Sequence, residues 1–294
     1  MHKGGKWARQ IIALQEEDGK WGCFHTLSRS YGAALTTEQA LRRLERLGYT
    51  MEDECIQKAV GYMEDCLAGK SSIPDRREKL HDWDIFTSLI LAAWIRRFTC
   101  DSPKANQVAR QWADIINSAF AKGAYDQDEY AAAFHSILGM KPRGGKRIDF
   151  VNFYPISLMQ GCLDERMECA VVDHVISRDN GIYYIYESGL SILPPVFESK
   201  NASRYLAAIE LLSFYKYAVG KLDFVVDWLY KNQNADGKWD MGKAVNDKIY
   251  FPLSDDWRKK EVREADCTER IGELVSRLTD GQRETEGDAI CRCI

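Results

Sequence analysis

The amino-acid sequence predicts an all-α protein, a barrel of about five to six concentric helix pairs. Apolar residues recur at helical spacing along most of the chain, and only Gly181 to Tyr186 reads as an extended strand. Long and short connections alternate between the helical segments. Two nearly identical seven-residue segments near the two ends indicate an internal repeat, which is typical of folds assembled from copies of one unit.

The periodicity predicts eleven helices, over residues 5–16, 37–47, 53–67, 83–98, 103–121, 127–139, 151–161, 165–177, 202–218, 221–233 and 257–278. Short loops follow some helices, whereas the connections 17–35, 68–81, 178–200 and 234–256 are long. This alternation suits an outer helix that returns through a long loop to an inner helix. Thr37 is expected to cap one helix start. The helix 83–98 is apolar on most faces and should be buried.

The repeated segments are Gln15 to Trp21 and Gln233 to Trp239, which share Gln, Asp, Gly, Lys and Trp at matching positions. Asp-Gly favours a turn, because glycine adopts positive φ and aspartate bonds nearby backbone. The tryptophan is expected to cover the preceding helix end while its indole N–H finds an acceptor. The glutamine amide is expected to tie that helix end to the next segment. The motif therefore predicts a structural brace.

A helix followed by Q-x-x-D-G-x-W and a second helix resembles the QW motif of the terpenoid cyclase and protein prenyltransferase α/α toroids. The resemblance implies an α/α toroid with squalene-cyclase-like repeats and an apolar or isoprenoid small-molecule ligand. We expect one toroid domain over residues 1–280. Residues 281–294 are expected to form a polar, disordered tail.

The composition fits a soluble globular protein, with 45% apolar and 29% charged residues. A net charge of −4 without a basic stripe gives no indication of nucleic-acid binding. No apolar run is long enough for a transmembrane segment, and no secretory signal is evident. The nine cysteines contain no C-x-x-C pair, which favours reduced thiols and a cytoplasmic location. Neither a cofactor nor an oligomeric state can be inferred.

In a toroid the starts of the inner helices converge on one mouth, and the predicted starts are rich in polar and aromatic side chains. Taken singly, each carboxylate there has a simpler interpretation as a helix cap. Together they resemble a site. The residues are Thr36, Thr37 and Glu38, then His81, Asp82, Trp83 and Asp84, then Tyr125, Asp126, Asp128 and Glu129, then Asn152 and Tyr154, and finally Ser203, Arg204 and Tyr205.

Two of these segments resemble the Asp-x-Asp-Asp motif of class II terpene cyclases, whose middle aspartic acid protonates an alkene or epoxide. The segment from Asp126 to Glu129 keeps three acids, and that from Asp82 to Asp84 keeps two. The resemblance implies that Asp128 or Asp84 donates the proton. Clustered carboxylates repel one another as anions, so that one of them retains a proton.

Protein prenyltransferases bind zinc through an Asp, a nearby Cys and a distant His, but Asp266 directly precedes Cys267 here and no histidine follows. We therefore predict no metal site. The enzyme class stays open between a class II cyclase-like and a prenyltransferase-like activity. A carbohydrate-active toroid and a non-catalytic binding toroid are the alternatives. Cavity or substrate-binding candidates are His81, Trp83, Tyr125, His135, Tyr154 and Arg204, although His135 also reads as a core histidine on an apolar face.

Overall fold

A computed structural model describes residues 2–25, 35–245 and 250–279 of the chain. Within these ranges the chain is mostly helical, and the sheet is a single two-stranded antiparallel hairpin. The helices are α1 (Lys6–Ile12), α2 (Thr37–Arg46), α3 (Glu54–Leu67), α4 (Trp83–Phe98), α5 (Pro103–Ala119), α6 (Gln127–Leu138), α7 (Phe153–Leu158), α8 (Glu165–Ser177), α9 (Lys200–Leu212), α10 (Asp223–Lys231) and α11 (Lys260–Thr279). The prediction of an all-α protein is confirmed.

Each predicted helix is present, and the differences lie at the ends. The segment predicted as 202–218 ends its α-helix at Leu212 and continues as a short 3-10 turn, η3 (Lys216–Ala218). The expected strand is half of a hairpin, in which β1 (Asn180–Ile182) pairs with β2 (Tyr186–Ser188). Thr36 rather than Thr37 caps α2, in a capping box with Gln39. The expected tail, 281–294, lies outside the described residues.

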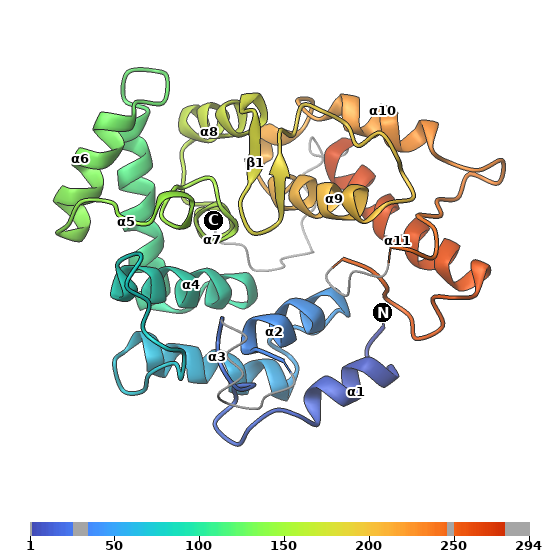
Figure 1. Cartoon of the computed structure of the whole chain (residues 1–294), viewed down its shortest axis with the longest axis horizontal. Coiled ribbons are helices and arrows are strands. Elements are labelled where there is room, and N and C mark those ends of the chain that lie inside the picture. The colour runs from blue at the N-terminus through green and yellow to red at the C-terminus, as the bar shows by residue number, and fades with distance from the viewer. Residues whose placement is uncertain (1, 26–34, 246–249, 280–294) are drawn as a thin grey trace.

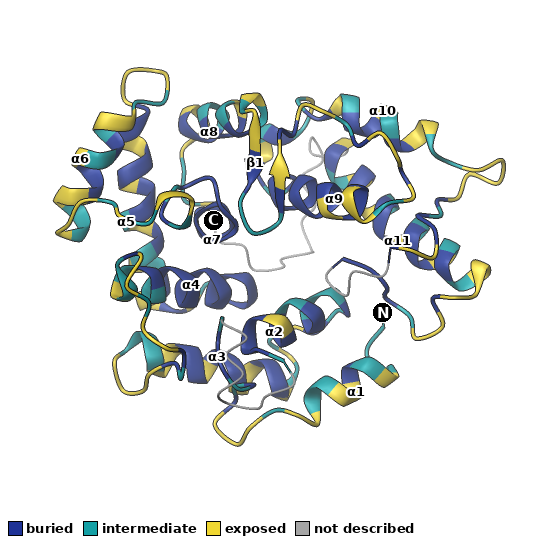
Figure 2. Cartoon of the chain, viewed as in Figure 1, coloured by how far each residue is buried: buried dark blue, intermediate teal, exposed yellow. Residues whose placement is uncertain are grey.

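Alternate helices lie nearer the middle of the molecule (Figure 1). Helices α2, α4, α7 and α9 occupy the inner positions, and α11 runs from the right-hand edge of the view towards them. Helices α1, α3, α5, α8 and α10 lie outside, with α6 at the periphery. Helix α4 packs against α3, α5 and α7, and α7 packs against α9. Helices α2, α4, α7 and α9 bury most of their side chains, whereas α1, α6 and α11 bury fewer than half of theirs (Figure 2). As expected, α4 is buried on most faces.

The two copies of the repeated motif have the same geometry. The indole N–H of Trp21 donates to the Ile11 carbonyl at 2.7 Å, and that of Trp239 donates to the Leu229 carbonyl at 2.7 Å. Both tryptophans are buried. In each copy the glutamine amide donates to the carbonyl of the motif glycine, at 2.8 Å in the first and 2.9 Å in the second. The predicted brace is therefore present at both ends of the chain.

The glutamines of the two braces differ in one contact. The amide of Gln15 also donates to the Cys55 carbonyl at 2.8 Å, at the start of α3. No equivalent second bond is recorded for Gln233 among the described residues. The Gln15 amide thus joins its helix end to α3, as the sequence predicted. The Gln233 amide closes only its own turn, and the second copy is joined to α11 by other groups, because Asn234 donates to Glu264 at 3.0 Å and the Trp239 backbone N–H donates to Thr268 at 3.2 Å.

The first and last segments of the described chain contact each other. The carboxylate of Asp255 accepts hydrogen bonds from the backbone N–H groups of Lys6 and Trp7, at 2.8 and 3.3 Å, and so caps α1. Arg43 of α2 donates to the Pro252 carbonyl. A single hydrophobic cluster of buried residues extends from Ala8 to Leu278. One core therefore includes both ends.

None of the described helices is long and apolar enough to cross a membrane. Among the cysteines that the structure describes, Cys55, Cys66, Cys162, Cys169 and Cys267 are free thiols. Cys100 is disulfide-bonded, so the expectation of reduced thiols is wrong at that position.

Candidate functional site

A buried carboxylate lies where the starts of α2 and α7 meet. Glu38 is 7% exposed, and both of its carboxylate oxygens accept from the Tyr154 hydroxyl at 3.0 Å. Arg42, one turn further along α2, donates to Glu38 at 2.9 Å. The Nδ1 atom of His25 lies 2.8 Å from Glu38 and 2.8 Å from the Tyr154 hydroxyl. Two of the residues predicted to form a mouth, Glu38 and Tyr154, are thus brought together.

The surroundings of His25 favour an ion pair with Glu38. Burial raises the pKa of Glu38, but the hydrogen bond from His25 and the charge of Arg42 outweigh burial and lower it to about 2. Burial lowers the pKa of His25, but the bond to Glu38 outweighs it and raises that pKa above its ordinary value. Glu38 is therefore an anion at neutral pH and is unsuited to donate a proton to an alkene.

The predicted acids at the start of α6 lie on the surface. Asp126 caps the helix by accepting from the N–H groups of Asp128 and Glu129 at 2.9 and 3.1 Å, which lowers its pKa. Lys122 pairs with Asp126 at 3.1 Å and with Glu129 at 2.9 Å. Asp128 is exposed. The simpler interpretation as a helix cap describes this segment, which lies on a peripheral helix (Figure 1).

The second acidic segment divides between a cap and a surface pair. Asp82 accepts from the Ile85 N–H at 2.9 Å and caps α4. Asp84 is exposed and pairs with Arg77 at 3.0 Å. His81 is only 1% exposed, and neither ring nitrogen has a hydrogen-bond partner among the described residues. Burial lowers the pKa of His81, whose ring packs on Phe86 with centroids 4.5 Å apart.

The remaining candidates are dispersed. Trp83 is half-buried against the rings of His81 and Phe86. Tyr125 lines a surface groove beside His174, whose pKa burial lowers to about 4. Arg204 is exposed at the edge of a cavity of about 410 Å³ that Arg42 and Tyr184 also line. His135 is exposed, so the interpretation as a core histidine is wrong.

A cluster of arginines around one buried glutamate lies at the C-terminal ends of the inner helices. Glu210 of α9 is 4% exposed. Its carboxylate accepts from Arg46 of α2 at 2.5 Å, from Arg270 at 2.8 Å and from Arg277 at 3.2 Å, the last two on α11. Three positive charges therefore share one negative charge in a largely desolvated place, where unbalanced charge is costly.

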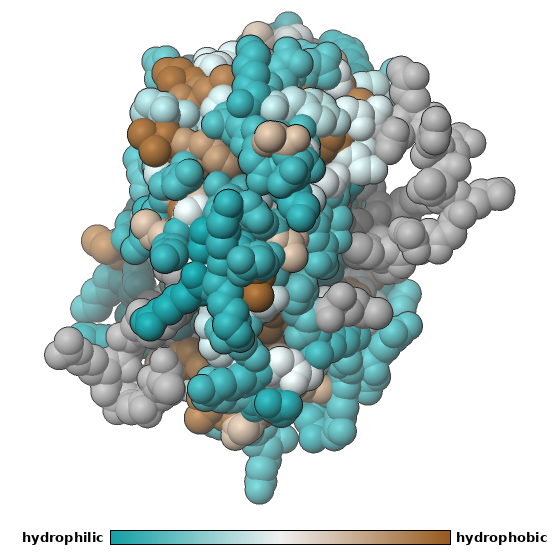
Figure 3. Space-filling view, turned by 90° about the vertical axis from the view of Figure 1, so that its right-hand side faces the viewer, coloured by the Kyte–Doolittle hydropathy of each residue, from teal (hydrophilic) through white to brown (hydrophobic). Residues whose placement is uncertain are grey.

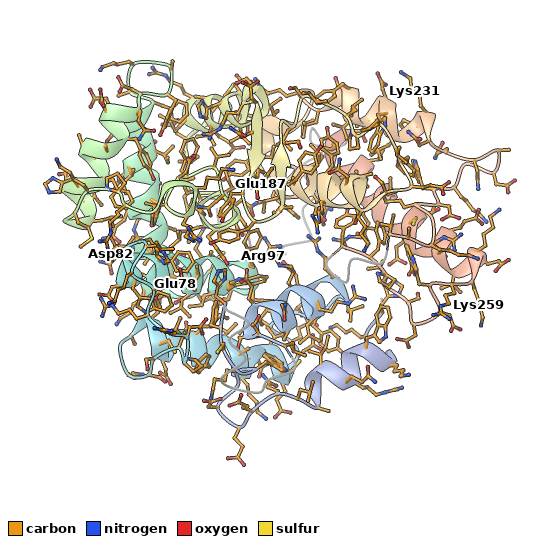
Figure 4. The ribbon with its side chains drawn as sticks, viewed as in Figure 1. Glu78, Asp82, Arg97, Glu187, Lys231 and Lys259 are labelled. Atoms are coloured by element: carbon orange, nitrogen blue, oxygen red, sulfur yellow. The ribbon has the colours of Figure 1, made fainter. Side chains whose placement is uncertain are left out.

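Arg97, at the end of α4, extends this cluster. Its guanidinium lies 2.6 Å from the Glu45 carboxylate and donates to the Ser157 hydroxyl of α7 at 2.9 Å. Figure 4 shows Arg97 in the middle of the molecule, among the inner helices. The Nε atoms of Arg46, Arg97, Arg270 and Arg277 are buried and have no hydrogen-bond partner among the described residues. We call these four residues with Glu45 and Glu210 the arginine cluster.

The arginine cluster forms the inner wall of a cavity of about 480 Å³. Apolar side chains line it beside the arginines, including Leu47, Tyr49, Met51, Phe98, Phe214 and Leu253. Three further glutamates, Glu52, Glu269 and Glu273, line it at exposed positions. The inner wall thus offers guanidinium donors, which bind carboxylates and phosphates through paired hydrogen bonds.

Sequence reasoning missed the arginine cluster. Its members come from four helices, and each arginine near a helix end reads as a favourable partner of the helix dipole. A signal was nevertheless present, because Arg97 ends the most apolar helix and Glu210 stands within an apolar run, Leu206 to Leu212. Charged residues rarely occupy such positions unless they are paired.

Among the described residues, no group of three or more histidine, cysteine or carboxylate side chains is placed to hold a metal ion. Comparison of the chain with protein-family models, curated proteins and solved structures finds no match.

Proposed function

We propose that this chain is an α/α toroid whose central cavity binds an anionic, partly apolar small molecule, with an isoprenoid diphosphate as the favoured ligand class. Two structural features support the toroid, namely the alternation of inner and outer helices (Figure 1) and the matching tryptophan hydrogen bonds of the two motif copies. The resemblance of that motif to the QW motif supports the isoprenoid class.

The arginine cluster is the main observation in support of the proposal, and it favours a ligand with an anionic group. Four buried arginine Nε donors have no hydrogen-bond partner within the described part of the chain, and three guanidinium groups share the Glu210 carboxylate. A buried N–H without a partner costs about 1–3 kcal/mol. A diphosphate or carboxylate in the cavity would supply acceptors to these donors.

The apolar part is argued from the wall of the same cavity. Tyr49, Met51 and Phe98 line it beside the arginines, and they would remove hydrocarbon from water. A phosphate ion alone has no hydrocarbon part that could contact these apolar side chains. The proposal concerns binding and does not assign proton donation to Asp84 or Asp128, because both side chains are exposed and Asp84 is paired with Arg77.

The proposal is tested by thermal shift and calorimetry with farnesyl diphosphate, inorganic pyrophosphate and farnesol. A ligand at a hundred times its dissociation constant stabilises the native state by about 2.7 kcal/mol. We expect the diphosphate to raise the melting temperature most, pyrophosphate to raise it less, and farnesol to leave it nearly unchanged.

Arg97→Gln should weaken diphosphate binding by tenfold or more, since a hydrogen bond from a charged donor contributes about 1.5–3 kcal/mol. Arg166→Gln, at an exposed position on α8, is the matched control and should bind like the wild type. Stabilisation by farnesol alone, or equal loss in both variants, would refute an anion site at the arginine cluster.

A further inference from the structure

Two surface loops meet beside the start of α4, and we call them the basic rim. They comprise residues 76–80, before α4, and residues 140–147, after α6. Arg143 of the second loop donates to the backbone carbonyl of His81 at 3.2 Å. Gly144 lies so close to His81 that an added Cβ would meet the His81 Cβ at 2.6 Å. The loops therefore form one continuous surface.

Positive charge is concentrated in the basic rim. Its basic residues are Arg76, Arg77, Lys79, Lys141, Arg143, Lys146 and Arg147, and all but Arg147 are exposed. Two of these charges are neutralised at the surface, because Arg77 pairs with Asp84 and Lys146 pairs with Glu187. The rim also contains one carboxylate, Glu78, so basic residues outnumber acidic ones there by seven to one. The chain as a whole has a net charge of −4, so the rim contrasts in sign with the rest of the molecule.

Two large apolar side chains are exposed on the same surface. Leu80 is 64% exposed next to Lys79, and Met140 is 41% exposed next to Lys141. The half-buried indole of Trp83 follows Leu80 on the first turn of α4. An exposed apolar residue is ordinary by itself, but two that each adjoin a lysine on abutting loops form the pattern of an interfacial anchor.

We propose that the basic rim docks this protein onto the surface of an anionic lipid bilayer. Lysine and arginine near a negatively charged membrane surface attract it, and apolar side chains among them insert between headgroups. A tryptophan beside them suits the membrane–water interface. Attachment of this kind needs no spanning helix. Exposed leucine and methionine side chains gain more from the hydrocarbon of a bilayer than from the charged backbone of a nucleic acid, which is why a bilayer is the favoured partner.

The experiment is co-sedimentation of the full chain with phosphatidylcholine vesicles that contain or lack phosphatidylglycerol. Binding should require phosphatidylglycerol and should weaken as salt is added, because the attraction acts between exposed charges. Lys79→Glu combined with Lys141→Glu should reduce partitioning by about thirtyfold or more, from roughly 1 kcal/mol for each basic residue near the surface. Leu80→Ser combined with Met140→Ser should also reduce it.

Matched controls lie on the other side of the molecule. Lys231, exposed at the end of α10, is far from Asp82 and Glu78 at the basic rim (Figure 4). The face over α10 and α11 is largely hydrophilic (Figure 3). Lys231→Glu, and Ile192→Ser at a 66% exposed position, should bind vesicles like the wild type.

Three results would overturn the proposal. They are equal binding to both vesicle types, equal loss of binding in the rim and control variants, and displacement of the protein from vesicles by single-stranded DNA, which would indicate a nucleic-acid partner. The wild-type salt dependence requires no substitution and remains decisive if a variant fails to fold. Because the rim is remote from the central cavity, this test can fail while diphosphate binding succeeds.

Discussion

The two motif copies allow one prediction to be made with an internal reference. Gln15→Ala removes two hydrogen bonds, to the carbonyls of Gly19 and Cys55, each 2.8 Å long. Gln233→Ala removes one, to the Gly237 carbonyl at 2.9 Å. A net hydrogen bond contributes about 1 kcal/mol to stability. We therefore expect Gln15→Ala to cost about 2 kcal/mol and Gln233→Ala about 1 kcal/mol.

The assay is urea unfolding followed by circular dichroism, with melting temperatures as a second measure. A difference of about 1 kcal/mol corresponds to about 2–4 °C for chains of this size. Gln107→Ala, at an exposed position in α5, is the control and should change stability by less than about 0.5 kcal/mol. If Gln233→Ala is as destabilising as Gln15→Ala, the bond that joins the first brace to α3 contributes nothing and the reasoning is refuted.

Two further predictions follow. Gly19 and Gly237 have φ of +97° and +71°, but a Cβ on Gly19 would meet the Lys58 carbonyl oxygen at 2.3 Å whereas one on Gly237 meets nothing within 4 Å. Gly237→Ala should cost about 1–2 kcal/mol and Gly19→Ala clearly more; equal melting temperatures would contradict this. Glu38→Gln should lower the free energy of unfolding by about 3 kcal/mol, and this loss should be largest between about pH 4.5 and 6.5. Glu38 has a pKa of about 2 in the folded protein, and its contribution to stability is lost as the pH falls towards that value. His25 has a raised pKa in the folded protein, so its contribution to stability is complete below the ordinary histidine pKa of 6.5. That contribution is lost as the pH rises through the pKa of His25 in the folded protein. A cost that stays constant from pH 5 to 9 would refute the ion pair.

Much of the fold could be predicted because its signals are local. The apolar periodicity placed every α-helix, and the Asp-Gly turns located both braces before any contact was known. Helix ends were less certain, since Leu212 ends α9 where apolar residues continue to Ala218. Tertiary packing, rather than propensity, decides such ends.

The candidate site could be predicted only in part. Glu38 and Tyr154 were placed at one mouth by the pattern of helix starts, and their hydrogen bonds confirm that they meet. Asp126 was predicted at the mouth for the same reason, but α6 is a peripheral helix and Asp126 only caps it. Arg46 and Arg270 are far apart in sequence and meet only at Glu210, so no local pattern could join them.

The contact between the first and last segments has a consequence for how the chain could be rearranged. The His2 imidazole lies 3.2 Å from the Glu269 carboxylate, and Thr279 ends α11 ten residues later, about 15 Å along the helix. A connection of roughly six extended residues would span that distance, which is shorter than the fifteen residues, 280–294, that follow Thr279 in the sequence. The order of the helices in space therefore does not depend on where the chain starts. A circular permutant opened at the exposed loop after Gly139 should keep the same core. This requires that Asp255 still caps α1.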